Sequence, residues 1–368
     1  MGLLYREYMN MNEFISVRKL PWGTVNEKNV SLYELSRPGG ISVKVSDYGG
    51  ILQSFLLPGE RERDIVLGYD TAEEYRRSQT FFGASVGPLA DRVGGASLCL
   101  GGRKISLEQN AGEDCMHSGS AGFHAQFWNS EPLPDGVRFF ASFTDAPLPG
   151  ALDVSIAYTL PTADTLRISY DAVCTEETAL SFTNHSYFSL EAPGEGRSCL
   201  GERLTLFASR YAETDCSSQP LVTGKALSVE GTPFDFRAGA VLEGRISAKD
   251  FPEIAAAGGV DNFFLTDGEG FRRQARLLSA DGKTELICRS DAPGILVYTG
   301  NGLINEKGKN GERYGKHGGV ALETENFPNA VNLPERRESV LMKPGEHFHT
   351  VTEFTVRVTE NGKLPRAF

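Results

Sequence analysis

One histidine lies in a segment whose pattern predicts a strand, a rigid support for a side chain that must be held in place. Residues 180–190 alternate at period two, which predicts a strand with leucine and phenylalanine on one face. His185 falls in the middle of this segment, on the polar face. A strand can hold a reacting group closely in place. A structural histidine that only satisfies its hydrogen bonds is the alternative interpretation.

A glutamate has a similarly unusual position in the segment 318–332. Val320 and Leu322 point to one side of the strand predicted there, and Ala321 and Glu323 point to the other. A carboxylate kept in a pocket acts as a base when its neighbours tune its pKa. The exposed face of an edge strand explains the same pattern without catalysis.

Other kinds of chemistry have weaker support. His347 and His349 have the spacing of a metal clip, but no third ligand is signalled nearby, and an alternating strand explains the spacing. We therefore predict no metal. The chain has no GxGxxG after a strand, no GxxxxGK[ST] and no GxSxG, so nucleotide binding and an esterase-type serine are unsupported.

Composition indicates a soluble globular protein. The 368 residues are 40% hydrophobic and 23% charged, with a formal net charge of −11 and a pI of about 5.2. The negative charge argues against nucleic acid or an anionic membrane as a partner. The six scattered cysteines form no CxxC pair, and the first residues contain no signal-peptide core. We therefore expect a cytoplasmic protein.

Short alternating strands recur along the chain and predict an all-β fold, a large sandwich of strands. Helices are predicted at only two places. Asp70 and Glu73 resemble a capping box that begins a short helix ending at Arg77, and residues 247–257 contain a second candidate. No linker divides the chain, so we expect one domain over residues 12–368, with residues 1–11 as an N-terminal extension. The clearest predicted strands cover 41–45, 137–143, 152–160, 166–172 and 354–358.

Seven segments in order resemble the aldose 1-epimerases, also called galactose mutarotases. Each motif alone is weak, but together they span the chain from about Trp22 to the last predicted strand. The segments are Gly49-Gly-Ile-Leu-Gln-Ser54 ("GGxxxS"), Gly83–Val93 ("GxxxGRxANRI"), His117-Ser-Gly with Gly122-Phe and Trp128 ("HGG…GF…W"), Thr183-Asn-His-Ser-Tyr-Phe188 ("TNHSYF"), Gly259-Val-Asp-Asn-Phe-Phe264 ("GxDHxF"), Tyr298-Thr-Gly-Asn301 ("YTGN"), and Leu322-Glu-Thr with Phe327–Asn332 ("LETQxxPDAxN").

The resemblance implies a β-supersandwich that interconverts the α and β anomers of free aldohexoses, chiefly galactose or glucose, with no cofactor. By position in the motifs, Glu323 is the implied base and His185 the implied acid. His117, Arg92 and Asp261 are the implied sugar-binding residues. Opening a hemiacetal ring needs one base and one acid around the bound sugar. Trp128 either shapes the pocket or belongs to the core.

The chain departs from the family pattern at three positions that concern sugar contacts. Pro88 replaces an arginine, Asp91 an asparagine and Leu296 a glutamine. An ionised Asp91 only accepts hydrogen bonds, and we expect it to hold the neighbouring Arg92 guanidinium by an ion pair. Two alternatives stay open: an enzyme of the same fold for another sugar or a sugar phosphate, and a non-catalytic sugar-binding protein. Either a monomer or a homodimer fits the sequence.

Overall fold

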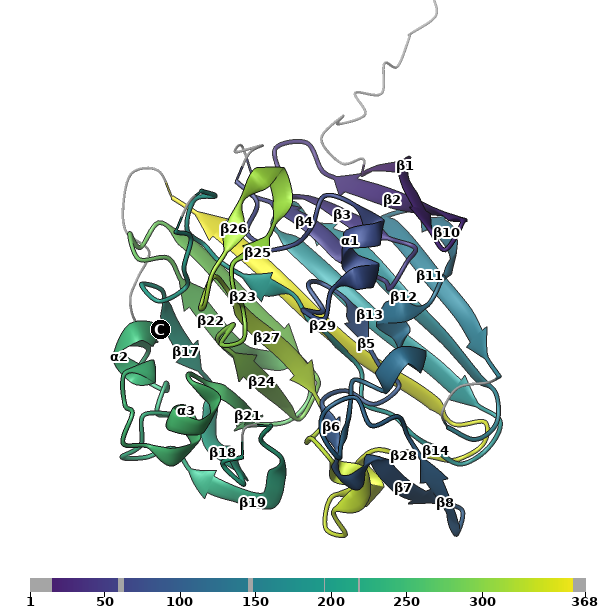
Figure 1. Cartoon of the computed structure of the whole chain (residues 1–368). Coiled ribbons are helices and arrows are strands. Elements are labelled where there is room, and N and C mark those ends of the chain that lie inside the picture. The colour runs from purple at the N-terminus through teal and green to yellow at the C-terminus, as the bar shows by residue number, and fades with distance from the viewer. Residues whose placement is uncertain (1–14, 59–62, 145–147, 195, 218, 360–368) are drawn as a thin grey trace, which may run out of the picture.

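The computed structural model describes residues 15–58, 63–144, 148–194, 196–217 and 219–359. The predicted N-terminal extension, residues 1–11, lies outside these ranges. Strands dominate and stack in layers, which confirms the all-β prediction (Figure 1). None of the helices in the described ranges has the length and apolar character needed to cross a membrane.

The largest sheet has nine strands and forms the broad base of the molecule. Its long C-terminal strand β29 lies between two parts of the chain that are far apart in sequence, β13 and β23 (Figure 1). The strand order is β10 (Asn129–Leu133), β11 (Gly136–Phe143), β12 (Leu152–Thr162), β13 (Thr165–Cys174), β29 (His347–Val358), β23 (Thr284–Ser290), β22 (Arg272–Leu278), β17 (Arg203–Leu206) and β20 (Ala240–Val241).

A six-stranded sheet packs against this base and bears most of the residues of interest. Its order is β16 (Tyr187–Phe188), β27 (Val320–Glu325), β24 (Gly294–Tyr298), β21 (Asp261–Thr266), β18 (Ala208–Thr214) and β19 (Val222–Ser228). Leu322 of β27 and Phe354 of β29 belong to one buried cluster, and Thr324 Oγ1 lies 2.5 Å from Thr352 Oγ1. Alternate residues of β27 thus face the large sheet. Ala321, Glu323 and Glu325 face the opposite way.

The remaining strands form a four-stranded sheet and several two-stranded pairs. The four-stranded sheet is β1 (Ser16–Val25), β2 (Lys28–Ser36), β3 (Ser42–Ser46) and β4 (Leu52–Leu56). The pairs are β14 (Thr178–Ala179) with β28 (Leu341–Met342), β15 (Thr183–Asn184) with β5 (Ser85–Val86), β25 (Glu306–Lys307) with β26 (Arg313–Tyr314), β6 (Arg92–Val93) with β9 (Cys115–Met116), and β7 (Ser97–Leu100) with β8 (Arg103–Ser106).

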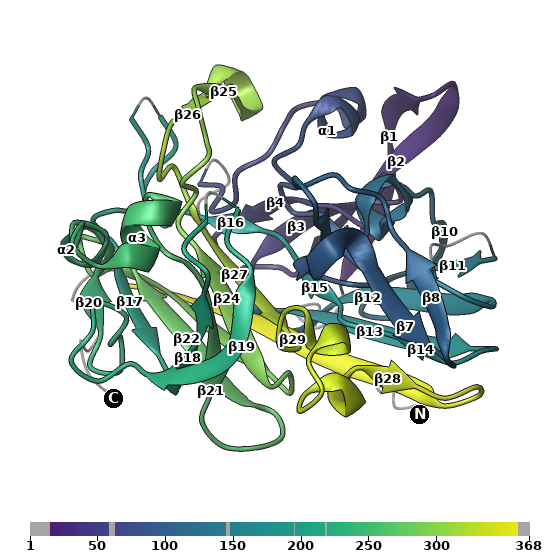
Figure 2. The same ribbon diagram turned by 60° about the horizontal axis from the view of Figure 1, so that its bottom comes forward.

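The short helices lie outside the sheets. The described residues contain α1 (Ala72–Arg77), α2 (Leu242–Ile246) and α3 (Pro252–Ala257), and α1 and the β25–β26 hairpin project on the side away from β29 (Figure 2). The predicted capping box is one residue out of place, because Thr71 and Glu74 form it. The second predicted helix begins only at Pro252, whose missing N–H and fixed φ suit a first turn.

The strand predicted over residues 180–190 is wrong in its continuity. The chain forms two short strands there, β15 and β16, which pair with different partners, β5 and β27. His185 lies between them. The whole segment is buried, including its polar residues, so neither face is exposed to solvent. Apolar residues do alternate along this segment, but pairing with two separate strands interrupts the ladder of backbone hydrogen bonds at His185.

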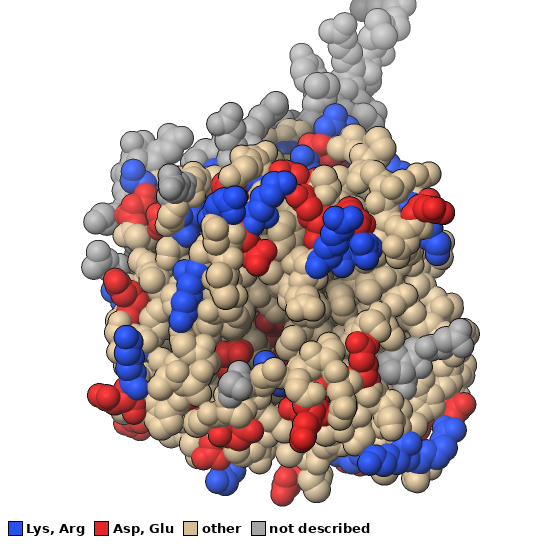
Figure 3. Space-filling model, in the orientation of Figure 1, with Lys and Arg blue, Asp and Glu red and all other residues tan. Residues whose placement is uncertain are grey.

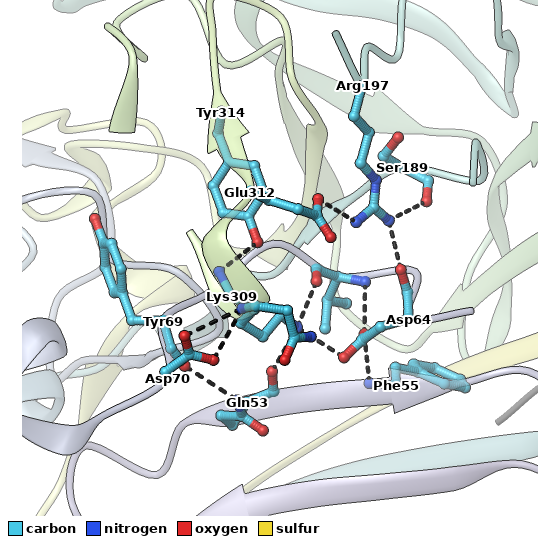
Figure 4. Close-up of polar contacts among 12 residues, drawn as sticks. Gln53, Phe55, Asp64, Tyr69, Asp70, Ser189, Arg197, Lys309, Glu312 and Tyr314 are labelled. Carbon is cyan, nitrogen blue, oxygen red and sulfur yellow. Dashed lines mark hydrogen bonds and ion pairs between the residues drawn. The ribbon is translucent and has the colours of Figure 1, made fainter. Parts of the chain in front are cut away.

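A buried ionic network fastens the segment that leads into β27 (Figure 4). Lys309 Nζ donates to Asp64 Oδ2 at 2.8 Å and to the carbonyls of Gln53 and Val66 at 2.9 and 2.7 Å. All three ammonium protons therefore have acceptors, as a buried charge requires. Arg197 adds a donor to the Asp64 carbonyl at 2.5 Å.

Candidate active site

A cavity of about 160 Å³ opens beside the inner strands of the six-stranded sheet. The face drawn in Figure 3 has a hollow near its middle, in which acidic side chains are visible. The volume corresponds to on the order of ten water-sized groups, the scale of one monosaccharide. The cavity is lined by Gln79, Phe81, Asp91, Arg92, Met116, His117, His185, Tyr187, Asp261, Leu296, Tyr298, Glu323 and Glu325.

All six site residues expected from the sequence line this one cavity: Asp91, Arg92, His117, His185, Asp261 and Glu323. They come from five segments that are remote in sequence and are joined by strand pairing. Trp128, in contrast, packs with Phe123 and Phe143 in the buried core. Of the departures from the family pattern, Leu296 lines the cavity and Pro88 does not.

Glu323 is held on an interior strand, not on an edge. β27 pairs with β16 on one side and β24 on the other, and Glu323 lies opposite Leu296. Its side chain is only 2% exposed, and Oε1 has no hydrogen-bond partner among the described residues. Burial, with nearby Asp91 and Asp261 adding to it, raises the pKa of Glu323 well above its ordinary value.

His185 is positioned by its backbone and by ring contacts. Its N–H donates to the Ala84 carbonyl, and its own carbonyl accepts from the Gly83 N–H, both at 2.9 Å. The imidazole stacks on Tyr187 with ring centroids 4.9 Å apart and an angle of 18°. Burial lowers the pKa of His185 to about 3, so the ring is neutral in the empty cavity. Its Nε2 lies 3.5 Å from Glu323 Oε1.

Asp91 and His117 fix each other through the backbone. The Asp91 N–H donates to His117 Nδ1 at 3.2 Å, and the His117 N–H donates to the Asp91 carbonyl at 3.0 Å. Burial first, and then His185, lowers the pKa of His117 well below its ordinary value. A neutral His117 whose Nδ1 accepts this hydrogen bond carries its own proton on Nε2, which leaves one donor for a ligand. Both residues have positive φ, 53° and 51°, as strained residues at functional sites often do.

Arg92 is the cation of the cavity. Its Nη1 lies 3.2 Å from Asp91 Oδ1, the ion pair expected from the sequence, and its Nε has no partner among the described residues. Burial alone lowers the pKa of Arg92, but Asp91, Asp261 and Asp114 outweigh it and raise the pKa. Burial raises the pKa of Asp261 to about 6, although Arg92 opposes that shift. The cavity therefore holds groups that can donate, accept and exchange protons.

Sequence reasoning missed Glu325 and the aromatic lining. Glu325 follows Glu323 by two residues on the same strand, so both carboxylates face the cavity. The signal was present in that spacing, and in the glutamate that stands where the family pattern has glutamine. Phe81 also lines the cavity and lies outside the seven segments, whereas Tyr298 begins the "YTGN" segment but was assigned no role from the sequence.

His347 and His349 lie elsewhere, on β29. Both rings contact Asp171 Oδ1 across the pairing with β13, at 3.2 and 2.8 Å. This carboxylate is a neighbour that the sequence did not signal. Within the described ranges, no group of three or more His, Cys, Asp or Glu residues is arranged to hold a metal ion. The contacts of His347 and His349 with Asp171 explain why these three side chains lie together on an exposed face of the large sheet.

Comparisons with known proteins place the chain in a family. The family model for aldose 1-epimerase matches residues 31–355. Galactose mutarotase of Bos taurus is 36% identical over 301 residues, 81% of this chain and 85% of that protein. Aldose 1-epimerase of Haemophilus influenzae is 32% identical over 330 residues, covering 88% and 94%. The fold matches galactose 1-epimerase from Lactobacillus acidophilus with a TM-score of 0.81 at 24% identity, over 94% of this chain and all of that one. The chain belongs to the aldose 1-epimerase family.

Proposed function

We propose that this protein interconverts the α and β anomers of free aldohexoses, galactose and glucose among them, by acid–base opening and reclosure of the sugar ring. The observation that carries the proposal is the meeting of Glu323 and His185 in the cavity, Oε1 to Nε2 at 3.5 Å. At that distance the two groups do not form a normal hydrogen bond with each other, so both remain available to a sugar.

Ring opening requires two coupled proton transfers. Glu323 takes the proton of the C1 hydroxyl, the electrons left on that oxygen form the C1 carbonyl, and the bond from C1 to the ring oxygen breaks. His185 supplies the proton that the ring oxygen then needs. After rotation about the C1–C2 bond, the reverse transfers close the ring on the other face of the carbonyl. Each positioned group contributes roughly 10²–10⁴-fold in rate.

The two groups share one proton over a wide pH range. Burial raises the pKa of Glu323 and lowers that of His185, so in the empty cavity the proton belongs to the carboxyl. A C1 hydroxyl that donates to Glu323 stabilises the carboxylate form and thereby favours transfer of the shared proton to His185. Substrate binding thus prepares the base and the acid together.

The other residues expected from the sequence supply binding. Arg92 offers its free Nε and His117 its Nε2–H as donors to sugar oxygens. Asp261 and Asp91 offer carboxylate oxygens to sugar hydroxyls. Charge-assisted hydrogen bonds of this kind are roughly twice as strong as neutral ones.

A sugar phosphate fits the cavity less well than a free sugar. Arg92 is the single Lys or Arg among the described lining residues, and it already pairs with Asp91. Lys307 and Arg77, which line the outer depression next to the cavity, pair with Glu74 and Glu73. A dianionic phosphate would therefore meet carboxylates with no free cation among these residues.

Polarimetry on freshly dissolved α-D-galactose and α-D-glucose tests the proposal. The protein should speed the approach to equilibrium rotation beyond the spontaneous rate, in proportion to its concentration. Binding of either sugar without any acceleration would instead identify a non-catalytic sugar-binding protein. The cytoplasmic location expected from the sequence belongs to the same proposal and is tested by cell fractionation.

A further inference from the structure

Glu325 is a buried carboxylate that the reaction does not use. It lies two residues beyond Glu323 on β27, about 7 Å along the strand, on the same face. The side chain is 2% exposed and lines the cavity, and neither Oε1 nor Oε2 has a hydrogen-bond partner in the described parts of the chain. A buried carboxylate without partners is costly, so a hydrogen-bond donor that enters the cavity beside Glu325 relieves that cost.

The ionisable groups in the cavity around Glu325 are mostly acidic. Asp91, Asp261 and Glu323 line the same cavity, and the one cationic side chain among the described lining residues, Arg92, is 3.2 Å from Asp91. Burial first, then Asp91 and Glu323, raises the pKa of Glu325 well above its ordinary value. The empty site therefore lacks a positive charge next to this carboxyl.

An ammonium group matches this deficit better than a hydroxyl does. A sugar hydroxyl donates a single hydrogen bond, whereas an ammonium donates three and carries the missing charge. The described residues contain no group of three ligands arranged for a metal ion, which leaves an organic cation as the better match.

We propose that the cavity accepts amino sugars, aldoses with an ammonium group on a ring carbon other than C1, and that Glu325 selects that ammonium while Glu323 and His185 act at the anomeric carbon. This inference rests on the proposed function. Glu325 is a specificity-determining residue in this scheme, not an acid or base of the reaction.

Comparison of matched sugars tests the inference. Mutarotation of D-galactosamine and D-glucosamine is compared with that of galactose, glucose and the two N-acetylated amino sugars, at about pH 6.5, where an amine is protonated. We expect kcat/KM to be about tenfold or more higher for the amino sugars than for the neutral sugars, the effect of roughly one additional charge-assisted contact. D-glucuronate should be the poorest substrate.

Glu325→Gln removes the charge and keeps the shape. The ratio of kcat/KM between amino and neutral sugars should fall about tenfold or more. Glu113→Gln is the matched control: it makes the same change at an exposed position outside the cavity. This control should leave the ratio within about twofold, since exposed charges act weakly at a distance.

Calorimetry of the unaltered protein gives a second measurement if Glu325→Gln does not fold. An ammonium beside Glu325 lowers the raised pKa of the carboxyl, so glucosamine binding near neutral pH should release protons. The heat should then depend on the ionisation enthalpy of the buffer, and N-acetylglucosamine should show much less of this dependence.

The outcomes separate the two proposals. Rapid mutarotation of galactose or glucose with no preference for amino sugars, and no buffer-dependent heat, overturns the amino-sugar inference and leaves the proposed function intact. Failure to accelerate mutarotation of any of these sugars overturns the proposed function and the inference with it.

Discussion

Glu323 Oε1 and His185 Nε2 lie 3.5 Å apart because their segments are paired, not because they bond to each other. Tyr187, two residues after the histidine, pairs with Ala321, two residues before the glutamate. The register of β16 on β27 therefore sets the distance between the two groups. Each group remains free to contact a sugar.

Removing either group should reduce turnover. Glu323→Gln and His185→Asn keep similar shapes, and each should lower kcat by about 10²-fold or more. The double variant should lose less than the product of the two effects, because the residues work as one unit. Polarimetry on α-D-galactose, corrected for spontaneous mutarotation, measures this. Glu113→Gln, the same change at an exposed position, serves as the control.

Near-normal kcat in Glu323→Gln would show that another carboxylate is the base. Asp261 would then be tested first, since it lines the same cavity with a pKa raised by burial to about 6.

The pH profile of kcat/KM should be a broad bell. An unperturbed glutamate and histidine would place the two limbs at about 4.3 and about 6.5. With the pKa of His185 lowered to about 3 and that of Glu323 raised, the form with one shared proton persists across neutral pH. Activity should fall in acid as the pair gains a second proton, and in alkali as it loses its only one.

Nuclear magnetic resonance checks the acid limb directly. The His185 ring signals, assigned by their absence in His185→Asn, should remain those of a neutral imidazole down to about pH 4. A titration near 6.5, the usual value for histidine, would contradict this account.

Asp91→Asn should affect binding more than chemistry. Asparagine cannot pair with the Arg92 charge, and the freed guanidinium changes its contacts with sugar hydroxyls. KM should therefore change by a modest factor with kcat nearly intact, the pattern of altered uniform binding. Steady-state kinetics on galactose decides it, and a large fall in kcat alone would place Asp91 in the proton-transfer machinery.

Glu325→Gln should stabilise the protein as the pH rises. The folded-state pKa of Glu325 is raised, so the native state keeps a proton that the unfolded chain releases above about pH 4.3. Native stability from this group therefore declines with rising pH through that window, whereas glutamine has no such dependence. Urea unfolding of both proteins at several pH values should show a growing advantage for the variant. An advantage that does not change with pH would be inconsistent with a raised pKa.

Lys309 should matter for stability and not for chemistry. Lys309→Met leaves Asp64 buried without its cation, which costs about 3–5 kcal/mol of unfolding free energy. Adding Asp64→Asn should recover part of this loss, since the amide oxygen still accepts from the Phe55 and Val66 N–H groups. Lys307→Met, at an exposed ion pair on the same segment, should cost no more than about 1 kcal/mol. Equal losses for the two lysine variants would contradict the role of the buried network.

The sequence by itself determined the elements and the identities of the expected site residues. Period-two alternation located β12, β13 and β29, because one face of each strand must be buried. The position of Glu323 and His185 in the ordered motifs made them the expected base and acid. Opening a hemiacetal ring requires one group of each kind. These inferences depend on local pattern and chemistry, which a single chain displays.

Tertiary structure decided what depends on distant neighbours. The break in the ladder at His185 arises because β15 and β16 pair with β5 and β27, partners about 100 and more than 130 residues away along the chain. Burial in the cavity, not residue type, moves the pKa of His185 down and that of Glu323 up. Alternation along β27 puts Glu325 on the same face as Glu323, but only the fold buries it among carboxylates contributed by other segments. Desolvation and long-range pairing have no local signature, so only the folded chain reveals them.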